Sequence, residues 1–336
     1  MSMAFLELRG VKKHFPVQKS LLAQLATRQR EFVHAVDGVD LTVEKGDVYG
    51  LVGESGSGKT TTGRITAALE RPTEGEVLLD GEDVTRLKRS ALKSFRQKVQ
   101  YIYQDPLSSL NPKMSVGDAV EEPLRYLAPR GTRRRETVDE MLEKVGLSPA
   151  ATFRDRYPHE LSGGQRQRVV IARALVTSPK YVVADEPVAM VDVSVRAQIM
   201  ELLLSMQREL DLTILLITHD LAVAKYMCNK ISVMYLGEIA ETGTNDQVFS
   251  NPMHPYTQAL KAAVPIPDPT ERSGKKVARG EVPSSLNPPA GCRFNPRCPF
   301  VFDRCKTEEP RILLTDKGNF VACHLYSDGR LKTPGG

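Results

Sequence analysis

The sequence predicts an α/β fold built on a parallel sheet, and three observations indicate it. Two near-continuous apolar runs, "KYVVADE" and "LTILLITHD", are typical of parallel strands buried on both faces. Arg196–Leu210 between them has the spacing of an amphipathic helix, so the order strand, helix, strand forms a crossover unit. A glycine-rich stretch, "GESGSGKTT", follows a third apolar run and opens another helix.

Length and composition limit the class of protein. The 336 residues suffice for two packed units, or for one domain with an extension. Hydrophobic content of 41% and charged content of 26% are typical of a soluble globular protein, and a net charge of +5 does not argue for nucleic acid. No run approaches the ~18 apolar residues of a membrane span, and the first ten residues lack the apolar core of a secretory signal. We therefore expect any work at a membrane to be done from its cytoplasmic face, through a partner.

The first ninety residues are predicted to form strands and one helix. "AFLELRGVKKHF" and "VHAVDGVDLTVEKGDVYGLVG" alternate apolar and polar residues, which indicates strands; "PVQKSLLAQLATRQRE" between them is predicted as an inserted loop or short helix. A helix is expected after Thr60, ending near Pro72. Glu74–Val84 is predicted as a hairpin with Asp80 and Gly81 in its turn.

The rest of the chain divides by composition. Lys98–Gln104 is predicted as a strand, and the following fifty residues as helices; the basic "RGTRRRE" heads a solvated one. "KISVMYLGEIAETG" is predicted as strands, and from about Asn251 a stretch rich in proline, glycine and serine is typical of a linker or extended arm. We expect a domain at 1–250, with a helical subdomain inserted at about 105–170, and an extension at 251–336.

The glycine-rich stretch has the pattern and the strand-to-helix context of a phosphate-binding loop. Its glycines let backbone amides curl around a phosphate; Lys59 reaches the β- and γ-oxygens, and the Thr60 hydroxyl is placed to ligate magnesium. The candidate ligand-binding residues of this loop are Gly53, Glu54, Ser55, Gly56, Ser57, Gly58, Lys59, Thr60 and Thr61.

Polar side chains follow the apolar strands. Asp185 ends one strand and suits magnesium, as a direct or indirect partner, while Glu186 is placed to act as general base on an attacking water. Taken alone, two acids at a strand end fit ordinary loop acids equally well; the phosphate loop favours the functional interpretation. His219 could meet the γ-phosphate, and the amide of Gln104 could touch both magnesium and water; each is a weak indication alone.

A second glycine pair raises a question. Ser162, Gly163 and Gly164 precede a helix in "LSGGQRQRVVIARAL", and the first amides of a helix form an anion site. Two anion sites in one chain indicate either two ligands or one ligand held from both sides.

These motifs, in this order, resemble the ATP-binding subunit of an ABC transporter over residues 4 to 250. The resemblance implies an ABC-type P-loop NTPase with a RecA-like core, an antiparallel β subdomain and a helical subdomain. Its motifs fall on the phosphate loop, Gln104, "LSGGQ" (Leu161–Gln165), Asp185 with Glu186, Asp192 and His219. It also implies an aromatic side chain stacked on adenine, for which Phe15 is the best candidate.

The resemblance implies a second ATPase subunit, identical or homologous. In this family two nucleotide-binding domains meet head to tail, and each ATP lies between one phosphate loop and the partner's signature helix. Ser162, Gly163, Gly164 and Gln165 would then serve an ATP held by another chain. The sequence departs from the family pattern "DEPxSxLD" at Ala189 and Val191 but keeps Asp192, so we expect hydrolysis to survive and coupling across the interface to be in doubt.

Four of the five cysteines crowd the tail: Cys292, Cys298, Cys305 and Cys323. Their spacing fits neither common zinc ribbons nor ferredoxins, disulfides are not expected in a cytosolic protein, and four buried free cysteines remain an alternative. Joint metal ligation fits their clustering better, as zinc or as an iron–sulfur cluster. Its role would be to pin a tail too loop-rich to bury a core.

The tail, with "NPMHPYTQAL" and "CRFNPRCPFVFDRC", resembles the C-terminal extension of the oligopeptide/dipeptide importer branch. This implies a 4Fe–4S cluster on the four cysteines, with His324 as a weaker ligand candidate. It also implies two transmembrane permeases and an extracytoplasmic solute-binding protein as partners, with peptide as the solute and oligosaccharide or metal as alternatives. A soluble ABC ATPase acting on nucleic acid or the ribosome is the competing function. Such proteins typically have two ATPase units in one chain or long coiled-coil insertions, and this sequence shows neither.

Overall fold

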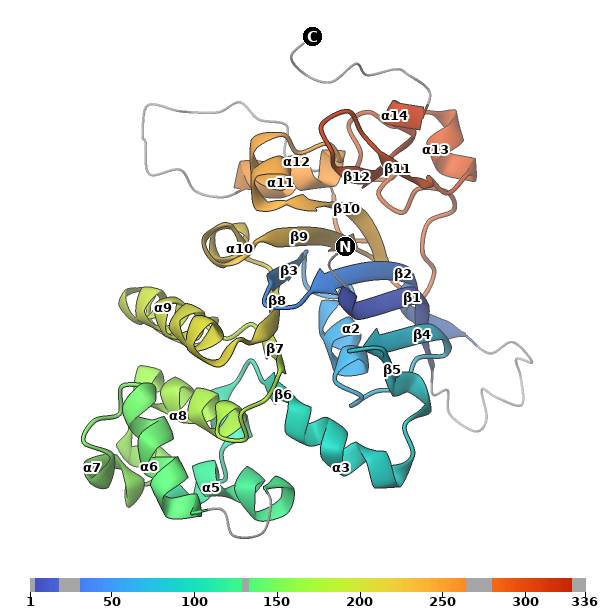
Figure 1. Ribbon diagram of the computed structural model, residues 1–336. Helices are drawn as coiled ribbons and strands as arrows, with labels where there is room; N and C mark the ends of the chain where they lie inside the picture. Colours follow the sequence, from blue (N-terminus) through green and yellow to red (C-terminus); the bar gives the residue numbers. More distant parts are fainter. Residues whose placement is uncertain (1–3, 18–30, 129–132, 264–279, 328–336) are drawn as a thin grey trace, which may run out of the picture. The chain divides into compact units, whose positions relative to one another are not determined.

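The computed structural model describes residues 4–17, 31–128, 133–263 and 280–327 (Figure 1). The chain divides into two compact units, each considered by itself. The first comprises residues 44–48 and 86–217, and the second comprises residues 4–43, 49–85 and 218 onward. The predicted domain boundary at residue 250 falls inside the second unit, and the division at that residue stays a prediction.

The first unit contains a parallel sheet of β6 (Val99–Ile102), β7 (Tyr181–Asp185) and β8 (Thr213–Thr218), in the order β8-β7-β6. Every residue of β7 and β8 is buried, which confirms the prediction that these apolar runs are strands covered on both faces. The crossover helix between them, α9 (Val193–Leu210), begins three residues earlier than predicted.

Helices make up the rest of the first unit. Their bounds are α3 (Arg89–Lys98), α4 (Pro106–Ser109), α5 (Val116–Leu127), α6 (Arg134–Lys144), α7 (Ala150–Arg154), the 3-10 turn η2 (Pro158–Glu160) and α8 (Gly163–Leu175). Helices α5 to α8 lie together in Figure 1 and bury Val120, Leu142 and Ile171 completely. This confirms the predicted helical region after residue 105; the first residues of the basic stretch "RGTRRRE" lie outside the described residues.

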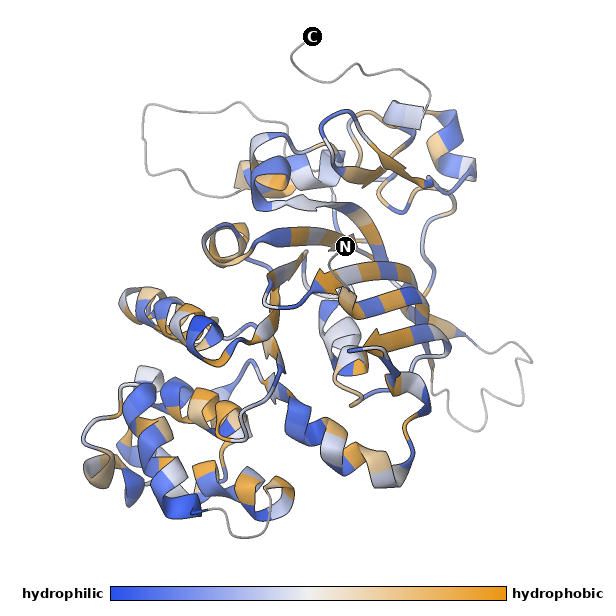
Figure 2. Cartoon of the chain, in the orientation of Figure 1, coloured by the Kyte–Doolittle hydropathy of each residue, from blue (hydrophilic) through white to orange (hydrophobic). Residues whose placement is uncertain are grey.

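The second unit contains a four-stranded sheet, in the order β2-β1-β4-β5. Its strands are β1 (Ala4–Pro16), β2 (Phe32–Glu44), β4 (Glu74–Leu79) and β5 (Glu82–Asp83), followed by the 3-10 turn η1 (Val84–Arg86). Hydrophobic and hydrophilic residues alternate along β1 and β2, as expected for a sheet with one buried face (Figure 2). Asp80 and Gly81 both have positive φ in the two-residue turn, which confirms the predicted hairpin.

A second sheet of this unit carries the order β11-β12-β10-β9-β3. Its strands are β3 (Val48–Val52), β9 (Lys230–Tyr235), β10 (Glu238–Thr244), β11 (Ile312–Leu314) and β12 (Phe320–Ala322). Strand β3 pairs with β9 in parallel, and the other neighbours are antiparallel. The helices of the unit are α2 (Lys59–Thr66), α10 (Leu221–Met227), α11 (Asn245–Ser250), α12 (Pro255–Ala263), α13 (Asp303–Thr307) and α14 (His324–Ser327).

The structure corrects two expectations about these elements. Helix α2 ends at Thr66, earlier than the predicted stop near Pro72, because Ala68 turns the chain with a φ of 51°. The tail was expected to be too loop-rich to bury a core, and that is wrong. Strand β12 pairs with β10, and Met253, Val321, Cys323 and Leu325 form a small core covered by Phe302 and Tyr326.

Two predicted segments, the insertion after Pro16 and the proline-rich arm, fall mainly on residues 18–30 and 264–279, outside the described part of the chain. Within the described ranges, no helix combines the length and the apolar character needed to cross a membrane.

Candidate nucleotide-binding site

The phosphate loop lies between β3 and α2, and its backbone shape depends on glycine. Gly56 and Gly58 have φ values of 78° and 105°, which L-residues rarely adopt. A Cβ on Gly58 would lie 2.1 Å from the Ala35 carbonyl oxygen, and one on Gly53 would lie 2.2 Å from the Met234 carbonyl oxygen. The loop therefore packs directly on the backbone of β2 and β9, and only glycine fits at these two contacts.

The Lys59 ammonium lies inside the curve of this loop. It donates hydrogen bonds to the carbonyl oxygens of Gly53 and Glu54, both at 2.7 Å, and to the Ser57 hydroxyl at 3.2 Å. Lys59 is only 5% exposed. A positive charge is thus fixed where the loop amides converge, which is the arrangement that holds the phosphates of a nucleotide.

Two long-range contacts hold Glu54, and neither was anticipated from the sequence. The Glu54 N–H donates to the Tyr256 hydroxyl at 2.8 Å, and the Glu54 carboxylate receives two hydrogen bonds from Arg297. Both partners come from the tail, about two hundred residues away along the chain. No local pattern in the sequence carries such a pairing.

In the first unit, the predicted magnesium and base residues lie at one edge of the sheet. Parallel pairing of β6 and β7 brings their carboxyl ends together, so Gln104 and Glu186 follow adjacent strands. The Gln104 side-chain amide donates to the Glu186 carboxylate at 2.9 Å, and the Tyr101 hydroxyl donates to the Asp185 carboxylate at 2.7 Å. The structure therefore brings together Gln104, Asp185 and Glu186.

Glu186 has an unusual backbone conformation. Its φ is 47°, in the left-handed region, although it is not glycine, and its N–H donates to the Ile217 carbonyl at 2.9 Å. Such a conformation costs of order 1–3 kcal/mol and persists where the surrounding structure enforces it, often at functional sites. This geometry directs the side chain toward Gln104.

The "LSGGQ" motif (Leu161–Gln165), here called the signature segment, lies at the N-terminus of α8, also in the first unit. The Ser162 hydroxyl accepts from the Gln165 N–H at 3.3 Å, and the Gln165 side chain accepts from the Ser162 N–H at 3.0 Å, which forms a capping box. Ser162 is exposed, whereas a Cβ on Gly164 would lie 2.6 Å from a Val195 methyl. The first turn of this helix is therefore held by its cap and by close packing at Gly164, while the capping serine is exposed.

The remaining predicted site residues take different positions. Asp192 is exposed at the start of α9, and His219 is exposed after β8, in the second unit. Phe15 on β1 is half-buried, with the Lys13 ammonium 4.8 Å from its ring centroid. The predicted site thus has residues in both units, and the roles assigned to them stay predictions.

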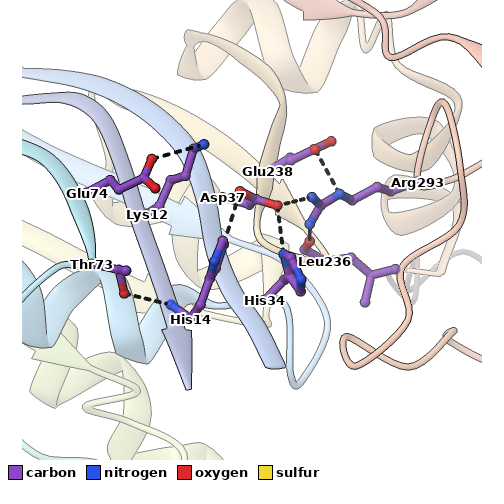
Figure 3. A network of polar contacts seen from close by, with 9 residues as sticks. All are labelled: Lys12, His14, His34, Asp37, Thr73, Glu74, Leu236, Glu238 and Arg293. Atoms are coloured by element: carbon purple, nitrogen blue, oxygen red, sulfur yellow. Dashed lines mark hydrogen bonds and ion pairs between the residues drawn. The ribbon is translucent and has the colours of Figure 1, made fainter. Parts of the chain in front are cut away.

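A polar network on the second unit, which includes the neighbour of Phe15 in the chain, was not predicted from the sequence (Figure 3). His14 and His34 lie 3.2 and 3.1 Å from the two carboxylate oxygens of Asp37, and Arg293 pairs with the same carboxylate. The two imidazoles and the carboxylate lie close enough for a metal ion. Burial disfavours the charged form of Asp37, but the Arg293 guanidinium beside it lowers the pKa of that carboxyl, so the carboxylate is already paired with a cation.

The tail cysteines lie near one another. Cys292 and Cys298 are partly buried, while Cys305 and Cys323 are buried, and all four are free thiols. Burial, together with a smaller effect of the other three thiols, raises the pKa of the Cys323 thiol to about 12.

Comparison with known proteins identifies the family. Residues 36–189 match the family described as ABC transporter, and residues 240–305 match the oligopeptide/dipeptide transporter, C-terminal region. The chain is 45% identical over 329 residues to the oligopeptide transport ATP-binding protein AppF of Bacillus subtilis, covering 96% of this chain and 97% of that one. It is 43% identical over 326 residues to the probable peptide ABC transporter ATP-binding protein y4tS of Sinorhizobium fredii, covering 97% and 91%.

Solved structures agree with the predicted fold. The ATP-binding cassette MJ0796, in a dimeric post-hydrolysis state bound to ADP and Pi, superposes with a TM-score of 0.62 at 31% identity, covering 71% of this chain and 98% of that one. The structure of cbiO1 from Clostridium perfringens, part of the cbiONQ transporter complex, gives 0.62 at 28% identity, covering 74% and 91%. This chain therefore belongs to the oligopeptide/dipeptide importer family of ABC transporter ATP-binding subunits, and it is an ABC-type ATPase.

Proposed function

We propose that this chain hydrolyses ATP at sites shared between two ATPase subunits, and that the cycle powers import of peptides through membrane permeases. The observation that carries the shared site is the glycine turn of α8. Ser162 is exposed and capped by its own helix, so this anion site is formed without help from the chain's own phosphate loop. Two separately formed anion sites in one chain suit a ligand held between two copies.

The phosphate loop fits ATP by the chemistry of its residues. Its close backbone packing leaves no room for side chains at Gly53 and Gly58, and Lys59 supplies a fixed positive charge. Magnesium suits the oxygen donors proposed to hold it, which are the Thr60 hydroxyl, the Gln104 amide and the Asp185 carboxylate. Phe15 would stack on the adenine.

Glu186 would act as the general base for hydrolysis. Its carboxylate would accept a proton from water as that water attacks the γ-phosphate, and the Gln104 contact at 2.9 Å would orient it. His219 would contact the γ-phosphate, and Asp192 would contact the partner subunit. Ser162, Gly163, Gly164 and Gln165 would hold the phosphates from the partner's side.

The names of the relatives support peptide as the solute, since AppF is named for oligopeptide transport. Two transmembrane permeases and a solute-binding protein would complete the importer, with this chain bound peripherally at the cytoplasmic face of the membrane. Purification of the tagged chain from the membrane fraction tests this. Co-purified permeases support the proposal, whereas nucleic acid or ribosomes would refute it in favour of a soluble ABC ATPase.

The solute is tested separately, with permeases and binding protein reconstituted in vesicles. Peptides should stimulate ATP hydrolysis, and oligosaccharides or metal ions should not. Stimulation by one of these alternatives alone would reassign the solute and leave the ATPase assignment intact.

We further propose that the four tail thiols hold a 4Fe–4S cluster, which would cross-link the segments that carry them. The residues fit such a group, because four free thiols on three separate segments influence one another electrostatically. Anaerobic purification should give a brown protein with iron and sulfide; a colourless protein with stoichiometric zinc would exclude the cluster.

A further inference from the structure

The second residue of the phosphate loop is held by the C-terminal extension. The Arg297 guanidinium donates to both carboxylate oxygens of Glu54, at 2.6 and 3.0 Å, in a two-pronged ion pair. Arg297 is 8% exposed and Glu54 is 30% exposed. A partly exposed carboxylate of the loop is therefore neutralised by a buried arginine.

Aromatic rings fix the position of this arginine. Its guanidinium carbon lies 5.8 Å from the ring centroids of both Tyr235 and Phe294. The Tyr235 hydroxyl accepts a hydrogen bond from Nη1 of Arg297 at 3.4 Å. Tyr256, which is fully buried, packs against both rings, with centroid distances of 4.6 and 5.4 Å. A buried cluster of this kind leaves the arginine little freedom to follow a displaced partner.

The same cluster also holds the loop backbone. The Tyr256 hydroxyl accepts the Glu54 N–H at 2.8 Å, and the Glu54 carbonyl accepts from the Lys59 ammonium at 2.7 Å. Glu54 is thus held at its side chain, its N–H and its carbonyl. Two of those contacts come from the extension, and the third is made by the lysine that faces the phosphates.

Arg297 belongs to the cysteine segment, residues 292–305 of the C-terminal extension. Arg297 precedes Cys298 directly, and the Cys292 N–H donates to the Cys305 carbonyl at 2.9 Å, so the cysteine turns fix the backbone around it. A second arginine of this segment, Arg293, is equally buried at 7% exposed. It pairs with Asp37 and Glu238 (Figure 3) and, within the described part of the chain, forms no hydrogen bond or ion pair with the phosphate loop.

We propose that Arg297 and Tyr256 are positioning residues for the phosphate loop, through which the C-terminal extension sets the affinity for ATP. Arg297 cancels the charge of a carboxylate that would otherwise repel the triphosphate, and Tyr256 fixes the loop amide next to it. The coupling is reciprocal, so nucleotide at the loop stabilises the cysteine segment in turn. This inference rests on the proposed assignment of the loop to ATP.

The test compares ATP affinity with stability in the full-length chain. Arg297→Gln should weaken binding of ATP with magnesium about tenfold, because it leaves Glu54 charged and unpaired. Arg297→Lys should recover part of the loss, and Tyr256→Phe should weaken binding about threefold, since one hydrogen bond is lost. Arg293→Gln is the matched control: it removes an equally buried arginine and should lower the melting temperature while leaving the ATP dissociation constant within about twofold.

A second measurement remains informative if Arg297→Gln folds poorly. Hydrogen exchange of residues 292–298 should slow when ATP binds to the wild type, and this protection should be lost in Glu54→Gln, which changes only the loop side of the pair. ATP affinity unchanged in Arg297→Gln or in Tyr256→Phe, or protection retained in Glu54→Gln, would overturn the inference and make these contacts a purely structural anchor. Failure of the wild type itself to bind ATP would instead refute the proposed function.

Discussion

Two helices of this protein have glycines at their N-termini, before the first residue in α2 and within the first turn in α8, and the two termini differ in structure. Helix α2 begins at Lys59, which is 5% exposed and bonded into the loop before it, while Gly58 at its cap has a φ of 105°. Helix α8 begins after exposed Ser162, which caps the helix with its own hydroxyl and has an ordinary extended backbone. The turn at α2 has a positive charge, that of Lys59, to bind a phosphate. The turn at α8 has only backbone amides and the Ser162 hydroxyl.

This difference indicates that the two turns have different roles. A fixed ammonium lets the α2 turn bind a phosphate within one subunit, whereas neutral donors on an exposed turn suit a phosphate that another subunit already holds. The α2 turn should therefore govern binding, and the α8 turn should govern hydrolysis. Substitutions in and around the two turns separate these two roles.

Glu186→Gln should reduce turnover at least about a thousandfold, because the amide cannot accept the proton of the attacking water. ATP binding should survive, so the variant should accumulate as a nucleotide-bound dimer detectable by light scattering after size-exclusion chromatography. Lys59→Ala in the same background should stay monomeric. Monomers of Glu186→Gln that bind ATP and never associate would contradict the shared site.

Ser162→Asp should lower turnover about a hundredfold while ATP still binds the isolated subunit. Aspartate is as good an N-cap as serine, so the helix should stay folded, but its charge would repel the partner's triphosphate. Ser162→Asn, which caps equally well without charge, should keep most of the activity. If the aspartate variant weakened ATP binding by the monomer, the α8 turn would have a role within its own subunit.

Gly58→Ala should destabilise the second unit by about 2–4 kcal/mol, because its Cβ would lie 2.1 Å from the Ala35 carbonyl. Gly56→Ala should cost only about 1 kcal/mol, since its φ is also positive but its Cβ would meet no atom within 4 Å. Denaturant unfolding without nucleotide measures both. Equal losses would show that backbone conformation, and not close packing, determines the glycine at position 58.

The smallest expected effect is on pH dependence at the base of the tail. Burial lowers the pKa of His254 to about 4, and its Nδ1 accepts the Tyr256 N–H at 3.0 Å. The unfolded chain binds a proton near pH 6.5 and the folded chain does not, so the stabilisation is present above pH 6.5 and declines as pH falls toward 4. Between pH 7.5 and 5.5 the loss should be about 1 kcal/mol.

The control for this effect is His254→Asn, which keeps a side-chain acceptor without a titrating ring. Its melting temperature should depend less on pH over that range than the wild type's does. Identical pH profiles for the two proteins would show that His254 does not titrate as its burial implies.

The sequence predicted the parallel strands, the phosphate loop and the signature turn, because each is encoded by adjacent residues with a local conformational purpose. It could not predict the tail strands: β11 and β12 are three residues long, and they form against the edge that β10 provides. Nor could it predict Arg297 or Tyr256 at the loop. Those contacts depend on which buried residues meet after folding, and no spacing in the sequence records that.

The rate of ATP hydrolysis per molecule, measured across a wide dilution series of the isolated chain, tests the shared site most directly. If each catalytic pocket needs the Ser162 turn of a second subunit, the rate per molecule should fall as the protein is diluted below the dissociation constant of the dimer. In Ser162→Asp this fall should occur at a higher protein concentration than in the wild type. A rate per molecule that stays constant at every dilution, in the absence of any other ABC subunit and in both proteins, would contradict the account.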